Sequence, residues 1–173
     1  WSALENASSG PVQEGTVGAG TGTMCFGWKG GIGTASRILP ESMGGFIIGA
    51  LLQTNFGSRR DLTILGVPVG RHLPVERLPS LPLPGSVMVI LATNAPLGAG
   101  QLKRLCLRAA GGLARTGAQF QHGSGDFVVA FSTANRIAHR AETTIAAQDM
   151  IVREERLLNL LFRCAGECVE EAV

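Results

Sequence analysis

The 173-residue sequence has little charge and no long apolar run. Charged residues make up 16% of it, the formal net charge is +2, and 45% of the residues are hydrophobic. This composition is typical of one globular domain with a buried core and excludes a disordered chain. The small net charge gives no electrostatic reason to expect a nucleic-acid partner. No apolar run reaches the ~18 residues of a membrane span, so we expect no membrane partner either.

Metal-binding and disulfide patterns are also missing. The four cysteines form no CxxC pair, and the three histidines lack ligand spacing to a carboxylate or to each other. Cys164 and Cys168 lie one helical turn apart on an apolar helix face, which favours core packing over metal binding. We expect no metal and no cofactor. Reduced cysteines favour a cytoplasmic location, although a signal peptide could be missing from a truncated start.

Two common site motifs are absent as well. The Gly-rich run GAGTG at 18–22 is not followed by the GK[ST] of a phosphate loop and does not open a helix as GxGxxG does. We interpret it as a glycine-dense strand and turn packed close to another backbone segment. No GxSxG nucleophile elbow occurs, and the serine of HGSGD at 122–126 lacks its flanking pattern.

Apolar periodicity predicts a mixed α/β (α+β) layered fold. The expected strands are 45–55, 61–69, 87–92 and 126–132, and the expected helices are 101–115 and 157–173. The strand at 45–55 has a continuous apolar run, which predicts burial on both faces. Residues 70–85 contain four prolines and are expected to be a linker, and 133–150 a polar connection. The chain starts at Trp1 and its last helix has no stop signal, so we expect a fragment of a longer protein.

The linker ends in the tripeptide Pro84–Gly85–Ser86, directly before a strand. One interpretation is a β-turn. The other is self-cleavage, in which the Ser86 hydroxyl attacks the Gly85 carbonyl. Glycine suits the upstream position because it has no Cβ to block attack. Cleavage would give Ser86 a free α-amine of pKa about 7.7–8.0, which can act as base for its own hydroxyl.

Four segments in order resemble one enzyme family. They are VGAGTGTMCFGWKGGIGTASR at 17–37, GALLQTNFG at 49–57, LPGSVMVILATNAPL with QLKRL at 83–105, and GSGDFVVAFSTAN at 123–135. Together they resemble the L-aminopeptidase D-Ala-esterase/amidase family, the DmpA-like group that includes the β-peptidyl aminopeptidases. LLFRCAGECVEEAV at 160–173 is more weakly similar.

The resemblance implies a self-processing hydrolase with an N-terminal serine nucleophile. The cut falls between Gly85 and Ser86, and Ser86 is the nucleophile. Ser124 matches a serine that hydrogen-bonds around the nucleophile, Asp126 an acidic position, and Asn55 an asparagine of the oxyanion hole. Asn55 could instead cap a strand end, and Ser124 could be a turn residue.

The resemblance also implies the architecture and the substrate class. The fold would be a four-layer α-β-β-α sandwich, with 1–85 as the end of the α-subunit part and 86–173 as the start of the β-subunit part. Members form homotetramers and hydrolyse short peptides, amides or esters with a free N-terminus, without a cofactor. Two features differ: the family uses a tyrosine, and this chain has none, and Asn94 stands where members usually have Asp.

Two other functions are compatible with the sequence. Ornithine acetyltransferases share the implied fold and transfer acyl groups, but they use threonine as the new N-terminus, which disfavours this alternative. A catalytically inactive fragment or module, in which Pro84–Gly85–Ser86 is only a turn, would remain a single chain.

Overall fold

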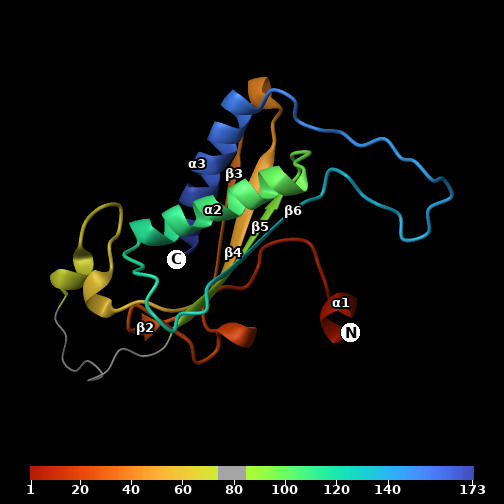
Figure 1. Cartoon of the computed structure of the whole chain (residues 1–173). Coiled ribbons are helices and arrows are strands. Elements are labelled where there is room, and N and C mark those ends of the chain that lie inside the picture. The colour runs from red at the N-terminus through yellow and green to blue at the C-terminus, as the bar shows by residue number, and fades with distance from the viewer. Residues whose placement is uncertain (74–84) are drawn as a thin grey trace.

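A four-stranded mixed sheet forms the centre of the protein in the computed structural model, which describes residues 1–73 and 85–173 (Figure 1). The strands follow the order β3, β4, β5, β6, and their bounds are Gly31–Ile38, Ile47–Asn55, Ser86–Thr93 and Phe127–Ser132. The first three strands are antiparallel, and β6 runs parallel to β5. A parallel pair needs a crossover, and helix α2 (Ala99–Arg115) provides it.

Helices α2 and α3 (Glu154–Ala172) cover the same face of the sheet (Figure 1). Their apolar sides pack against the alternate residues of β4 and β5 that point toward them, and this cluster is the hydrophobic core. Its largest fully buried side chains include Ile48, Leu52, Leu91, Leu105, Leu113, Leu158 and Leu161. Burial of each such side chain contributes about 1.5–3 kcal/mol.

The two helices approach closely at a glycine. A Cβ on Gly112 would lie 2.5 Å from the carbonyl oxygen of Gly166 and 2.8 Å from Cβ of Val169. The basic side chains on the outer part of α2 also reach α3: Arg104 pairs with Glu154 at 2.9 Å, and Arg115 with Glu170 at 3.2 Å. Part of the basic face of α2 is therefore bound to α3.

The other face of the sheet carries no α-helix in the described part of the chain, although the 3₁₀ turn Gly18–Gly20 contacts β3 and β4 there. Burial alternates along β4 and β5, so the prediction that the strand at 45–55 is buried on both faces is wrong. Met88, Ile90, Val129 and Phe131 are exposed on this side, which we call the open face. The mixed α/β class is confirmed. The described residues make one layer of helices and one layer formed by the four-stranded sheet, two of the four layers that the resemblance implies.

The segment at 61–69 is not a strand, contrary to prediction. Arg59–Asp61 and Val69–Arg71 are 3₁₀ turns, and only an isolated bridge joins Ile64 to Val67. Leu65 and Gly66 both have positive φ (49° and 81°), which reverses the chain. Conversely, β3 was not predicted, because its glycines and short polar residues give no apolar alternation.

The remaining segments are short or irregular. They comprise the helix α1 (Ser2–Glu5), the two-residue strands β1 (Met24–Cys25) and β2 (Trp28–Lys29), and 3₁₀ turns at Gly18–Gly20 and Glu41–Met43. A Cβ on Gly20 would lie 2.7 Å from Cα of Gly31, which confirms close backbone packing in the Gly-rich run. The run itself is a 3₁₀ turn and not the expected strand, because its glycines and threonines give no strand alternation.

The polar connection expected at 133–150 lies outside the sheet. Residues 133–150 contain no helix or strand and extend away from the sheet (Figure 1). Most of the predicted linker at 70–85 lies outside the described residues. Asn94 accepts the N–H of Ile47 through Oδ1 at 2.7 Å, an acceptor role that Asp could also fill. No helix in the described ranges combines the length and apolar character that a membrane span requires.

Candidate active site

Ser86 and Asn55 are directly paired at one end of the sheet. Asn55 is the last residue of β4 and Ser86 the first of β5, and the antiparallel register places them opposite each other. Side chains of directly paired residues point to the same face. Both alternate with buried neighbours, Thr54 and Val87, so both lie on the open face.

The Gly85–Ser86 peptide is held by a small hydrogen-bond network. The Ser86 hydroxyl donates to its own upstream carbonyl, with 2.8 Å between Oγ and the Gly85 oxygen. The Gly125 N–H donates both to Ser86 Oγ, at 3.2 Å, and to the Gly85 oxygen, at 3.3 Å. A single backbone donor therefore contacts both the hydroxyl and the carbonyl of this peptide.

Gly85 fits this position because it has no side chain. A Cβ there would lie 2.8 Å from the backbone oxygen of Asn55 and 2.9 Å from Cα of Phe56. Side-chain carbons do not approach backbone atoms so closely, so any other residue would force this end of the sheet to shift. The close approach keeps the Gly85 carbonyl beside Ser86.

Ser124 and Asp126 form a pair in the segment that leads into β6. The Ser124 hydroxyl donates to Asp126 Oδ1 at 2.7 Å, and both residues are partly buried. A carboxylate acceptor makes this bond stronger than a neutral one. Ser124 also donates its backbone N–H to the Gln121 carbonyl at 2.9 Å, so it is a turn residue as well.

The Asn55 amide has a defined orientation. The backbone N–H of Met24 donates to its Oδ1 at 3.1 Å. Because a backbone N–H can only donate, the oxygen of the amide must face Met24. Asn55 thus ends its strand with a side-chain hydrogen bond to the backbone of β1, and its Nδ2 group is turned away from Met24.

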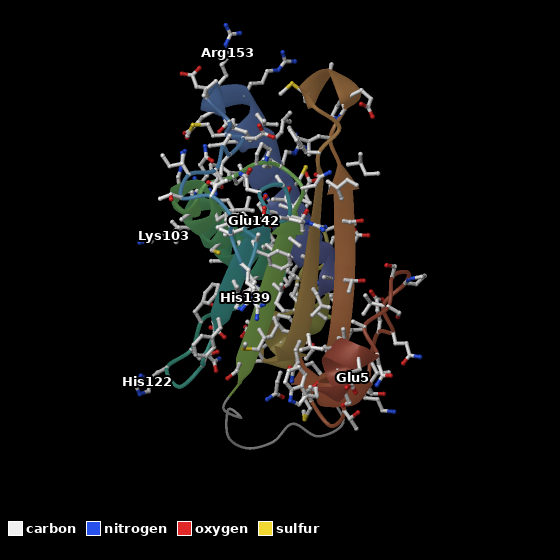
Figure 2. All side chains as sticks on the ribbon, turned by 90° about the vertical axis from the view of Figure 1, so that its right-hand side faces the viewer. Glu5, Lys103, His122, His139, Glu142 and Arg153 are labelled. Carbon is white, nitrogen blue, oxygen red and sulfur yellow. The ribbon has the colours of Figure 1, made fainter. Side chains whose placement is uncertain are left out.

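A pocket of about 390 Å³ lies next to this network, on the helix side of the sheet end. Gly85, Ser124 and Asp126 line it together with the apolar side chains of Phe56, Val87, Leu113 and Phe120. Ser86 and Asn55 do not line it. His122 is also among the lining residues, and Figure 2 shows it at the tip of the loop before β6, pointing away from the strands.

No competing thiol or metal site lies at this end of the sheet in the described residues. Burial raises the pKa of the Cys25 thiol to about 11, and a thiol of that pKa is protonated and unreactive near neutral pH. Within residues 1–73 and 85–173, no group of three or more His, Cys, Asp or Glu side chains could hold a metal ion.

The structure thus brings together Ser86, Gly85 and the backbone of Gly125, pairs Ser124 with Asp126, and sets Asn55 opposite Ser86. Sequence reasoning missed the Gly125 amide and the Met24 amide. The position of Gly125 inside GSGD could have indicated the first. The second could not be found from sequence, because it depends on a contact between residues 31 positions apart.

The comparison with protein families decides the classification. The model of peptidase family S58 matches residues 1–173 of this chain. The chain belongs to peptidase family S58. Among curated proteins, this S58 chain is 40% identical over 185 residues to the beta-peptidyl aminopeptidase BapA of Sphingosinicella microcystinivorans. That match covers 99% of the chain and 46% of the relative.

Solved structures agree with this classification. The L-aminopeptidase D-Ala-esterase/amidase of Ochrobactrum anthropi, described as a variant of the Ntn-hydrolase fold, has a TM-score of 0.88 and 46% identity. The match covers 99% of the S58 chain and 46% of that structure. The Burkholderia sp. beta-aminopeptidase has a TM-score of 0.85 and 42% identity, with 99% and 48% covered. The S58 chain therefore spans about half the length of these relatives.

Proposed function

We propose that this chain is the self-processing part of a serine aminopeptidase whose nucleophile is Ser86. The observation that carries the proposal is the hydrogen-bond network around the Gly85–Ser86 peptide. The hydroxyl is 2.8 Å from the Gly85 oxygen, and one N–H contacts both groups. Membership of a peptidase family supports the same conclusion.

The first reaction is cleavage of the chain's own peptide bond. Ser86 Oγ bonds to the Gly85 carbonyl carbon while negative charge develops on the carbonyl oxygen, where the Gly125 N–H can stabilise it. The bond between that carbon and the Ser86 nitrogen then breaks, and the hydroxyl proton moves to the leaving nitrogen. Water hydrolyses the resulting ester and releases a Gly85 carboxylate and an N-terminal Ser86.

The second reaction is hydrolysis of a substrate by the freed Ser86. Its α-amine, with an ordinary pKa of about 7.7–8.0, accepts the hydroxyl proton as Oγ attacks the substrate carbonyl. Asp126, held by Ser124, electrostatically supports the protonated amine. The Nδ2 group of Asn55 donates to the tetrahedral oxyanion. Loss of one such donor typically costs about 2.7–4 kcal/mol.

The two products of self-cleavage should remain associated. The proposed cut divides 1–85, the end of an α-subunit part, from 86–173, the start of a β-subunit part. β4 and β5 lie on opposite sides of the cut and pair over eight positions, from Ile48↔Thr93 to Asn55↔Ser86. α3 also packs against β3 and β4, so each piece completes the core of the other.

The proposed substrates are short peptides, amides or esters with a free N-terminus. The relatives are named as beta-peptidyl aminopeptidases and as an L-aminopeptidase D-Ala-esterase/amidase, which supports this class. We further propose a homo-oligomer, a tetramer by family resemblance. A cytoplasmic location is proposed from the four free cysteines.

The proposal is tested by assaying the full-length protein with α- and β-aminoacyl p-nitroanilides. Wild type should release p-nitroaniline from substrates with a free amine and much less from their N-acetylated forms. Ser86→Ala should remove this activity. Ser36→Ala, at an exposed serine of β3, is the control and should retain it. Full activity in Ser86→Ala would contradict the proposal.

A further inference from the structure

A strained hairpin next to Asn55 is the starting point. β1 and β2 pair as Met24↔Lys29 and Cys25↔Trp28, so Phe26 and Gly27 form the turn. Both turn residues have positive φ, 50° and 76°. This conformation costs little for glycine, but it is unfavourable for phenylalanine. The hairpin therefore depends on contacts outside itself to hold this shape.

Those contacts come from the residues that directly follow Asn55. The Phe26 N–H donates to the Phe56 carbonyl at 2.8 Å, and the two rings meet edge to face with centroids 5.1 Å apart. Phe26 is 1% exposed. Arg59 holds the other side of the hairpin: its Nη2 donates to the Gly27 carbonyl at 2.6 Å, and its guanidinium lies 4.2 Å over the Trp28 ring.

Arg59 holds the hairpin through the planar shape of its guanidinium more than through its charge. It forms no ion pair with any described residue, and its Nε is buried without a hydrogen-bond partner there. An unsatisfied buried N–H is unfavourable. The planar guanidinium can stack on an aromatic ring and donate within its own plane at the same time, whereas a lysine ammonium cannot.

The hairpin determines which atom of Asn55 is available. The Met24 N–H at the start of β1 donates to Asn55 Oδ1 at 3.1 Å. If the hairpin moved, the amide could rotate and present its oxygen toward the reacting carbonyl. An oxygen there would repel the developing oxyanion, whereas an N–H stabilises it.

We propose that Arg59 is a positioning residue that acts through Asn55. By clamping the hairpin Met24–Lys29 it keeps the Met24 N–H on Asn55 Oδ1 and so keeps Nδ2 available as the oxyanion donor. This inference rests on the proposed function, and it assigns a role to a residue that does not itself contact the reacting atoms.

The test is a double-mutant cycle in the full-length protein. Asn55→Ala should lower kcat by about 10²–10³-fold. Arg59→Lys should lower kcat by about tenfold and leave KM nearly unchanged. A tenfold loss corresponds to the free energy of about one hydrogen bond to a charged group. In the Asn55→Ala background, Arg59→Lys should have no further effect, because its target is gone. Arg60→Lys, at the exposed neighbouring arginine, is the control and should leave kcat unchanged.

A second measurement does not depend on activity. Hydrogen exchange of the Met24 amide should be about tenfold faster in Arg59→Lys than in wild type and unchanged in Arg60→Lys. Unchanged exchange, or an equal loss of kcat in both Asn55 backgrounds, would overturn the inference. If wild type itself shows no peptidase activity, the proposed function fails separately, and the exchange result alone decides whether Arg59 holds the hairpin.

Discussion

Substitution of Gly85 by alanine is expected to slow self-cleavage without unfolding the protein. The new Cβ would lie 2.8 Å from the backbone oxygen of Asn55 and 2.9 Å from Cα of Phe56. Both neighbours are backbone atoms, so a side-chain rotation cannot relieve the overlap. Overpacking of this kind costs about 1–3 kcal/mol. Because the strain displaces the carbonyl that Ser86 is proposed to attack, we expect cleavage to slow by about 5- to 150-fold.

The assay follows the fraction of uncleaved chain by mass spectrometry after purification of a freshly expressed protein. Gly111→Ala is the matched control, because a Cβ at Gly111 meets no atom within 4 Å. A thermal melt should show that Gly85→Ala is still folded. Wild-type cleavage kinetics in a folded Gly85→Ala variant would refute the reasoning, because cleavage would then not depend on the close packing of Gly85 against the backbone of Asn55 and Phe56.

Three further outcomes follow from the structure. In Gly112→Ala the new Cβ would lie 2.5 Å from an atom of α3, so the urea midpoint should fall by the equivalent of about 1–3 kcal/mol. Gly111→Ala, at an exposed position of the same helix, should raise the midpoint slightly. Equal shifts in the two variants would refute the helix contact. Asp126→Asn should lower kcat about 10- to 100-fold in the p-nitroanilide assay, because the protonated α-amine of Ser86 loses the charge interaction with the carboxylate. An unchanged kcat would show that the carboxylate takes no part in the mechanism. Burial raises the pKa of the Cys25 and Cys168 thiols from 9.0 to about 11, so the unfolded chain loses these protons at lower pH than the folded chain. The stability that the two thiols contribute should therefore be full below pH 9 and fall toward pH 11, a range in which the sequence has no tyrosine to titrate. Constant urea midpoints from pH 8.5 to 10.5 would contradict this.

The sequence predicts the periodic elements of the fold well. α2 and α3 have continuous apolar stripes at helical spacing, and β4, β5 and β6 have dense apolar runs, so local pattern and tertiary packing agree. The segment at 61–69 has an equally apolar composition, but Leu65 and Gly66 turn the chain there. Strand β3 is the opposite case, since it is held by its ladder with β4 and has no apolar alternation of its own.

Much of the candidate site is visible in the sequence only through family resemblance. Ser86, Asn55, Ser124 and Asp126 can be named by matching segments, but their mutual geometry depends on strand register. The Gly125 amide and the clamp by Arg59 depend on contacts over 39 and 32 positions of sequence. Such contacts carry no local signal, because every residue except proline can supply a backbone N–H, and an arginine in a loop is usually solvated.

The central claim is that Ser86 breaks the Gly85–Ser86 bond, and the intact mass of the purified full-length protein tests it most directly. We expect two species, with N-terminal sequencing of the second one beginning SVMVIL. Ser86→Ala should give a single uncut mass. One uncut mass for wild type, or the same two species from Ser86→Ala, would contradict the account.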